Sequence, residues 1–117
     1  IGLSANQIGI NERVFVMILD IDTQETITCF NPKILKYSKD MVVMEEGCLS
    51  YPDMYLDVPR PESVVVKYED EGKKVHKLKL EGLAARVFQH EYDHMEGIDF
   101  SQRANVAINT SKELTLN

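Results

Sequence analysis

Residues 82–96, GLAARVFQHEYDHME, have the pattern of an amphipathic helix. Leu83, Val87, His90 and His94 recur at helical spacing and therefore share one face. Histidines four residues apart project about 40° apart, one turn along the helix axis. Their imidazoles can therefore bind the same metal ion.

Glu91 follows His90 directly and can reach a water molecule bound to such an ion. The alternative is that two histidines fell four residues apart by chance on a solvent-exposed face. However, the pair continues the apolar face of Leu83 and Val87, and imidazoles that are buried without a partner are costly. The pattern therefore favours a metal site over a chance spacing.

A hydrolytic metal site usually has three protein ligands and one position open to water. Cys48, in the segment Glu46–Ser50, is the best candidate for the third ligand. From spacing alone, a role as a small buried hydrophobic residue is equally compatible with this cysteine. We expect Cys29 to lie in the core and His76 to point outward from a strand.

The rest of the chain is predicted to consist mainly of strands. The segment Glu46–Pro61 contains three prolines, so we expect an irregular, constrained loop there. Asn31 and Pro32 should end the second strand, and Gly97 should end the helix. The expected strands are Arg13–Asp20, Thr26–Phe30, Ile34–Tyr37, Met41–Met44, Glu62–Tyr68 and Val75–Leu80, with the first two and the last two forming hairpins.

Composition and charge narrow the classes of protein. A chain of 117 residues with 44% hydrophobic and 27% charged residues is typical of a single globular domain. The net charge of −6, with scattered basic residues, disfavours direct binding to nucleic acids. No apolar run is long enough to span a membrane. Two cysteines make no disulfide framework, which favours a reducing compartment.

Three segments resemble the motifs of the peptide deformylase family. Residues Gly2–Gly9 resemble the first motif, Glu46–Ser50 matches the second, and Gln89–His94 matches the third. The resemblance covers Ile1–Phe100 of a single domain at 1–117, and 101–117 is a polar tail. It implies an α+β fold in which antiparallel sheets pack around a central helix that carries the histidines. Because the chain begins inside the first motif, we expect residues upstream of it.

The resemblance also implies an activity, the removal of the N-formyl group from the initiator methionine of nascent polypeptides. Cys48, His90 and His94 would hold one divalent metal ion, natively Fe(II), which Zn, Ni or Co can replace. Glu91 would act as general base and then general acid. The side-chain amide of Gln7 and the backbone N–H of the residue after Cys48 would stabilise the oxyanion. The residue after Cys48, which would supply this N–H, is Leu49.

A methionine side chain needs an apolar pocket near the metal, and the pocket candidates are equally compatible with a core role. They are Ile1, Met44, Leu83 and Val87. Gly2 could let the substrate backbone approach as an added strand, and Gly47 is a further candidate for contact with the substrate. Gln89, Asp93 and Arg60 are expected behind the ligands, and we predict an Asp93–Arg60 ion pair that positions the Cys48 loop against the helix. Arg86 is expected at the solvent-exposed surface.

The implied partners are N-formylmethionyl nascent peptides, and transient contact with a ribosome is compatible with them. No membrane partner is expected. The implied location is the cytoplasm of a bacterium or of a virus-infected bacterial cell, or the interior of an organelle.

Two alternative functions use the same histidines. A zincin-type metallopeptidase would need a further ligand downstream, where Glu96 and Glu113 occur but no histidine and no convincing zincin continuation follow. An inactive homologue with a structural metal would need a fourth ligand. It would also be expected to have lost Glu91 or Gln7, which are both present.

Overall fold

The computed structural model describes the backbone of residues 2–4, 13–48 and 51–98, and the side chains of residues 13–47 and 55–98. Two sheets and one helix form within these ranges. In chain order the elements are β1 (Gly2–Ser4), β2 (Val14–Asp20), β3 (Glu25–Tyr37), β4 (Met41–Cys48), β5 (Tyr51–Pro61), β6 (Ser63–Glu69), β7 (Val75–Glu81) and α1 (Gly82–Met95).

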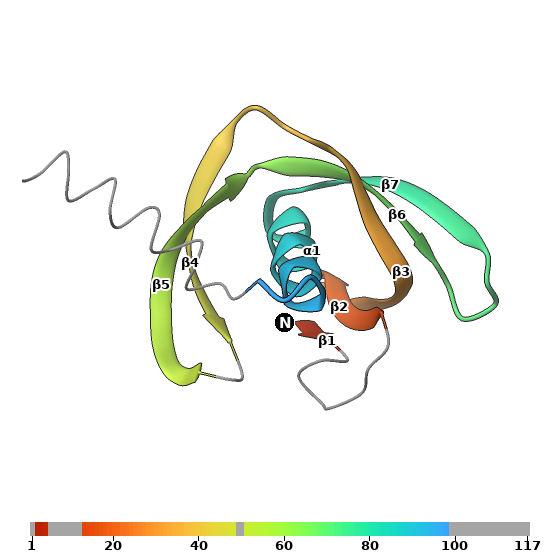
Figure 1. The fold of residues 1–117 in the computed structure, drawn as a ribbon, viewed down its shortest axis with the longest axis horizontal. Coiled ribbons are helices and arrows are strands. Elements are labelled where there is room, and N and C mark those ends of the chain that lie inside the picture. The colour runs from red at the N-terminus through yellow and green to blue at the C-terminus, as the bar shows by residue number, and fades with distance from the viewer. Residues whose placement is uncertain (1, 5–12, 49–50, 99–117) are drawn as a thin grey trace, which may run out of the picture.

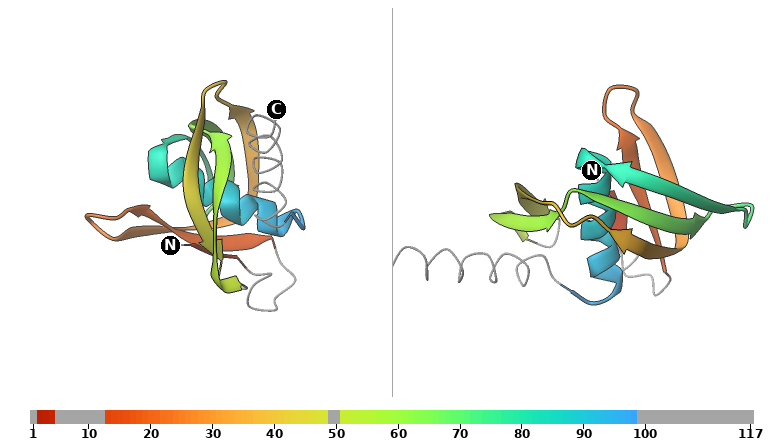
Figure 2. Two further views of the ribbon diagram at one scale, coloured as in Figure 1. Left: turned by 90° about the vertical axis from the view of Figure 1, so that its left-hand side faces the viewer. Right: turned by 90° about the horizontal axis from the view of Figure 1, so that it is seen from above.

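The helix α1 lies between the two sheets (Figure 1). The larger sheet has the strand order β1-β2-β3-β6-β7, and β4 pairs with β5 in a separate two-stranded sheet. All of these pairs are antiparallel. Views from two other directions show the same arrangement, with the five-stranded sheet and the β4–β5 ribbon on different sides of α1 (Figure 2). The expected α+β fold around a central helix is confirmed.

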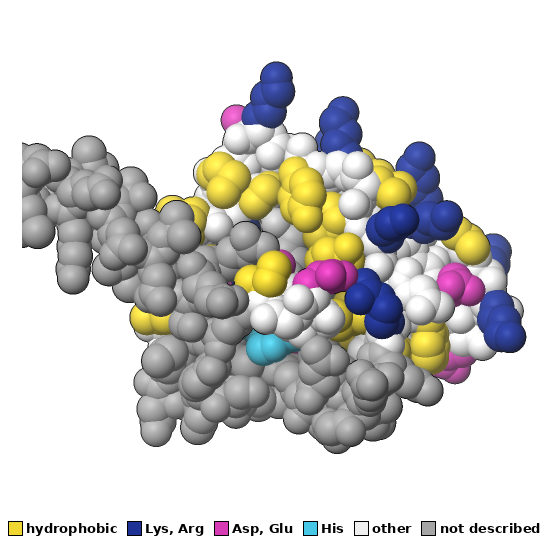
Figure 3. Space-filling view, viewed as in Figure 1, with side chains coloured by type: hydrophobic (Ala, Val, Ile, Leu, Met, Phe, Trp, Pro, Cys, Tyr) yellow, Lys and Arg dark blue, Asp and Glu magenta, His cyan; other side chains and the backbone are white. Residues whose placement is uncertain are grey.

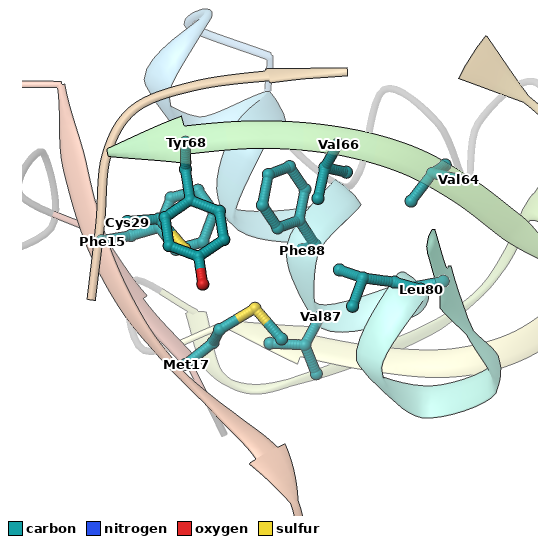
Figure 4. Close-up of a cluster of buried hydrophobic side chains, with 10 residues drawn as sticks. Phe15, Met17, Cys29, Val64, Val66, Tyr68, Leu80, Val87 and Phe88 are labelled. Carbon is teal, nitrogen blue, oxygen red and sulfur yellow. The ribbon is translucent and has the colours of Figure 1, made fainter. Parts of the chain in front are cut away.

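The hydrophobic core lies where α1 packs on the five-stranded sheet (Figure 4). The rings of Phe15 and Phe88 meet edge to face with centroids 5.0 Å apart, an arrangement that aromatic pairs prefer. In β7, exposed residues alternate with His76, Leu78 and Leu80, which are more buried, so the expectation that His76 points outward is wrong. The buried cluster consists of Phe15, Met17, Cys29, Val64, Val66, Tyr68, Leu80, Ala85, Val87 and Phe88.

The helix ends as predicted. Gly97 has a φ of 77°, a left-handed conformation that glycine adopts without strain. Its N–H donates to the carbonyl of His94 at 3.1 Å, and the N–H of Ile98 donates to the carbonyl of Asp93 at 2.7 Å. These two bonds form a Schellman motif, which satisfies the last carbonyls of the helix. The helical turn that carries His94 is therefore fixed at its end.

The prediction that Asn31 and Pro32 end a strand is wrong, because β3 runs through both residues. Asn31 has a φ of 49°, and the pairing with β6 shifts register between Phe30 and Lys33. Such a bulge lets a strand pass a residue that cannot donate a backbone hydrogen bond. The Asn31 side chain also donates to Glu69 at 2.9 Å and fixes the bulge.

The prediction of an irregular loop at Glu46–Pro61 is also wrong, because β4 and β5 pair over most of this segment. Pro59 pairs with Val43, and Pro61 pairs with Met41. The two prolines are two residues apart, so both occupy the same kind of position in the antiparallel ladder. A two-stranded ribbon consists of edge strands, where proline is tolerated.

No helix in the described part of the chain is long and apolar enough to cross a membrane. On the face drawn in Figure 3, hydrophobic side chains occupy the middle, and lysines and arginines are spread towards the rim. This spread agrees with the scattered basic residues in the sequence.

Candidate metal centre

The side of α1 that faces the β4–β5 ribbon is polar and yet buried. Arg86, Gln89, His90 and Asp93 lie there, and all four are buried. The ribbon contributes two further buried charged residues, Glu46 from β4 and Arg60 from β5. Buried charges are stable only when they are paired and hydrogen-bonded, so the contacts of this cluster decide its role.

His90 and His94 face each other as two ligands of one ion would. Their Nε2 atoms are 3.3 Å apart, and Nδ1 of His90 lies 2.7 Å from Oε1 of Glu46. An ionised carboxylate only accepts hydrogen bonds, so Nδ1 of His90 donates to Glu46, and Nε2 is the nitrogen that would bind a metal ion. Two nitrogens on one tetrahedral ion, each about 2.05 Å from it, would be about 3.3 Å apart. The histidine pair therefore fits a metal ion.

Glu46 is held in the ionised form by its surroundings. Burial alone would raise the pKa of this carboxyl, but hydrogen bonds from His90, Arg60 and Arg86, together with the Arg60 charge, lower the pKa to about 2. A carboxylate that fixes the far nitrogen of a histidine ligand is the usual partner of metal-binding imidazoles. Sequence reasoning missed this role, although Glu46 opens the segment that carries Cys48.

The third predicted ligand is only partly described. The backbone of Cys48 ends β4 and pairs with Tyr51, but its side chain lies outside the described residues. Among the described side chains, no group of three potential ligands surrounds one point. The described donor set is therefore the histidine pair.

Arg60 and Asp93 form the ion pair that the sequence predicts, with Nη1 2.7 Å from Oδ2. Arg60 also donates from Nε and Nη2 to the two oxygens of Glu46, at 2.6 and 3.0 Å. The pairs raise the pKa of the Arg60 guanidinium despite the opposing effect of its burial. One guanidinium thus joins a strand of the ribbon to the helix.

The prediction that Arg86 is solvent-exposed is wrong, because only 6% of it is exposed. Its guanidinium donates to Glu46 and to backbone carbonyls of both ribbon strands. Arg86 lies one turn before His90, but nothing in the sequence pattern indicated that a ribbon covers this side of the helix.

Glu91 and Gln89 are both buried on the helix. Glu91 is 2% exposed and directly follows His90. Gln89 donates from Nε2 to the carbonyls of Pro61, at 2.9 Å, and of Ala85, at 3.1 Å. Gln89 therefore ties α1 to the end of β5.

The structure describes only some of the remaining predicted site residues. Ile1, Gln7 and Leu49 lie outside the described residues, and only the backbone of Gly2 is described, in β1. Met44 is half-buried in β4.

The face shared by Leu83 and Val87 is not uniformly buried. Leu83 is 38% exposed, whereas Val87 packs in the core. Gly47 lies opposite Tyr55, whose ring would come within 2.7 Å of an added Cβ. A local packing reason for this glycine therefore exists beside any role in binding substrate.

The two residues expected outside the site are indeed elsewhere. Cys29 is buried in the core, and burial raises the pKa of its thiol to about 12. His76 stacks on Tyr68 and lies 2.8 Å from a carboxylate oxygen of Asp70. Neither residue belongs to the cluster around Glu46.

Comparisons with known proteins show the family of the chain. The sequence model of the polypeptide deformylase family matches residues 1–109. A curated relative is peptide deformylase 2 of Prochlorococcus marinus, 42% identical over 97% of this chain and 58% of its own length. Another is a peptide deformylase of Picosynechococcus, 40% identical over 97% of this chain and 62% of its own length. The chain thus spans about three fifths of the length of these relatives.

Solved structures give the same answer for the fold. A peptide deformylase from Thermotoga maritima has a TM-score of 0.83 and 40% identity, over 88% of this chain and 68% of its own. A probable peptide deformylase from Synechococcus phage S-SSM7 also has a TM-score of 0.83, with 46% identity over 88% of this chain and 71% of its own. The chain belongs to the peptide deformylase family.

Proposed function

We propose that this chain carries the catalytic centre of a metal-dependent hydrolase that removes the N-formyl group from the initiator methionine of nascent polypeptides. One observation carries the proposal, the histidine pair of α1. The two Nε2 atoms lie at the separation of ligands on one ion, and Glu46 fixes the ring of His90. Membership of the deformylase family supplies the reaction that such a centre would serve.

The family implies a divalent metal ion. We propose Fe(II) as the native ion, with Zn, Ni or Co as replacements, held by His90, His94 and the thiolate of Cys48. Cys48 follows Glu46 by two residues at the end of β4, and Glu46 already reaches His90. When bound, the ion supplies Lewis acidity, which polarises the formyl carbonyl and makes water more acidic.

Glu91 would move the protons of the reaction. Its carboxylate would take a proton from the water that attacks the formyl carbon and then deliver it to the nitrogen of the leaving amine. The C–N bond breaks, and formate and a free amino terminus result. The burial of Glu91 supports this role, because a site shielded from bulk water strengthens such interactions.

Two further groups would stabilise the transition state. The side-chain amide of Gln7 and the backbone N–H of Leu49 would donate hydrogen bonds to the developing oxyanion. Leu49 follows the proposed ligand Cys48 directly. An N–H at this position moves with the ligand, so the oxyanion donor and the ion would keep a fixed separation.

The substrate would lie along β1. This strand is at the edge of the five-stranded sheet among the described elements, so it can pair with an extended peptide. Ile1, Gly2, Met44, Gly47, Leu83 and Val87 are the proposed neighbours of the formylmethionine. N-formylmethionyl nascent peptides are the proposed partners, reached in the cytoplasm or inside an organelle through transient contact with a ribosome.

The test is formate release from a formyl-Met peptide by the full chain, purified anaerobically because Fe(II) and its thiolate ligand oxidise. We expect turnover by the wild type and a loss of about 10²-fold or more for Glu91→Gln. Glu96→Gln is the matched control, because this carboxylate lies just after the same helix and is exposed. It should leave the rate unchanged.

Substrate comparisons separate this proposal from its alternatives. A formyl-Ala peptide should react more slowly than the formyl-Met peptide, and equal rates would remove the methionine pocket. Cleavage of internal peptide bonds without formate release would indicate a metallopeptidase. A metal-loaded protein that releases no formate would indicate an inactive homologue.

A further inference from the structure

We propose that Arg86 is a positioning residue of the metal centre, which holds the ring of His90 in its ligating orientation by acting through Glu46. This inference rests on the proposed function of the histidine pair. Neither the ion nor the substrate is expected to touch Arg86 itself, because its donors are directed at other groups of the protein.

The guanidinium of Arg86 joins three parts of the structure. Nη1 donates to Oε2 of Glu46 and to the carbonyl of Val58 in β5, both at 2.7 Å. Nη2 donates to the carbonyl of Val42 in β4 at 2.5 Å. One side chain from the second turn of α1 therefore fixes both strands of the β4–β5 ribbon and the carboxylate between them.

The carboxylate of Glu46 has all of its acceptor positions in use. Oε1 receives Nδ1 of His90 and Nη2 of Arg60, and Oε2 receives Nε of Arg60 and Nη1 of Arg86. A carboxylate has about four lone-pair sites, so four donors leave it one orientation. Because one of the four is the His90 ring, the orientation of that ring depends on the other three.

Arg60 and Arg86 hold Glu46 in different ways. Arg60 lies in β5 and joins Glu46 to Asp93 of the helix, whereas Arg86 lies in the helix itself and joins Glu46 to backbone carbonyls of both ribbon strands. The rigid planar fork of an arginine can serve several acceptors at fixed angles, which the single ammonium of a lysine cannot. Arg86 thus fixes the distance between the strand of Cys48 and the helix of the histidines.

The direction in which Arg86→Met changes metal affinity distinguishes a positioning role from a purely electrostatic one. A positive charge close to a bound cation opposes binding, so its removal by Arg86→Met should tighten binding if charge were all that mattered. If Arg86 positions His90, the same change should weaken binding. Loss of a group behind a metal ligand typically weakens affinity about 10- to 100-fold.

The experiment measures Co(II) affinity by competition with a chelator, in wild type, Arg86→Met and Arg86→Lys. We expect Arg86→Met to bind Co(II) about 10-fold more weakly, and Arg86→Lys to fall between it and the wild type. The ¹⁵N signals of the His90 ring in the metal-free protein should change from one tautomer to a mixture. Arg13→Met is the matched control, because Arg13 makes an exposed pair with Glu96 just beyond the same helix.

A double-mutant cycle tests the route through Glu46. In a Glu46→Gln background the substitution Arg86→Met should have little further effect on Co(II) affinity. Unchanged or tighter binding by a folded Arg86→Met protein overturns the proposal, as does a full effect in the Glu46→Gln background. If Arg86→Met does not fold, Arg86→Lys decides by the same criteria.

The proposed function fails in a different way. A wild type that binds no Co(II) removes the metal centre itself, and the inference on Arg86 with it. A wild type that binds Co(II) as tightly as Arg86→Met, with a single His90 tautomer in both, leaves the metal centre standing and removes only the role of Arg86.

Discussion

The helix α1 has two buried faces that are held by different forces. Towards the five-stranded sheet it presents Ala85, Val87 and Phe88, which pack in the hydrophobic core. Towards the β4–β5 ribbon it presents charged groups, Arg86 and Asp93, that pair with Glu46 and Arg60. The apolar face anchors the helix, and the charged face sets the geometry of the histidines between the two layers.

The difference follows from what each layer can offer. A five-stranded sheet supplies a wide apolar surface, and burial of that surface is non-directional. A two-stranded ribbon supplies little apolar area but many backbone carbonyls and charged side chains. Hydrogen bonds to charged groups are directional, so this side can fix a ligand orientation that apolar packing cannot.

The largest effect on stability should come from the apolar face. Phe88→Ala removes a fully buried ring that meets Phe15 edge to face. We expect the free energy of unfolding of the metal-free protein to fall by about 3–5 kcal/mol in urea titrations. Leu83→Ala on the same helix is the control, because Leu83 is 38% exposed and should lose far less. Equal losses would mean that the sheet side is not the anchor.

Arg60→Leu should remove two ion pairs from the charged face of α1. The change leaves the carboxylates of Glu46 and Asp93 buried with fewer donors, and breaking such a pair costs about 3 kcal/mol. We also expect the metal content of the purified protein to fall, whereas Phe88→Ala should retain metal as long as it is folded. Stability and metal content that both match the wild type would contradict the account.

The charged face should also be sensitive to acid. Hydrogen bonds lower the pKa of Glu46 to about 2 from an ordinary value of 4.5. A lowered pKa in the folded state means that the stabilisation is fully present above pH 4.5 and is lost as the pH falls towards 2. In this window the metal-free wild type should lose on the order of 2 kcal/mol more than Glu46→Gln. Parallel pH profiles for the two proteins would refute the assignment.

The smallest effect on the free energy of unfolding should come from an ion pair that belongs to neither face of α1. Arg13 and Glu96 are 2.7 Å apart, with 46% and 40% of their side chains exposed. Exposed pairs contribute less than about 1 kcal/mol, so Arg13→Met should unfold almost as the wild type does. A loss as large as that of Arg60→Leu would remove the distinction between buried and exposed pairs.

The packing of the apolar face of α1 on the five-stranded sheet could be predicted from the sequence, because its signals are local. The helix period at residues 82–96 and the alternation of Val75–Leu80 both reflect repeats that burial imposes. Gly97 also predicted the end of the helix locally, because the left-handed conformation at that position favours glycine. The pairing of Arg60 with Asp93 followed from motif resemblance rather than from a local pattern.

The charged face could not be predicted in full, because it depends on which elements meet. Arg86 was expected in solvent, since no repeat in the sequence shows that a ribbon covers it. The prolines of Glu46–Pro61 suggested a loop, although a two-stranded ribbon tolerates them at edge positions. No local signal indicates the role of Glu46, because its hydrogen bond to His90 spans 44 residues of sequence.

The proposed metal centre has three protein ligands, Cys48, His90 and His94, and one position open to solvent. X-ray absorption spectroscopy of the Zn-loaded protein tests this most directly. The account predicts one sulfur at about 2.3 Å, two imidazole nitrogens at about 2.0–2.1 Å, and one light atom from solvent. A first shell without sulfur, or one that contains a fourth protein ligand, would contradict it.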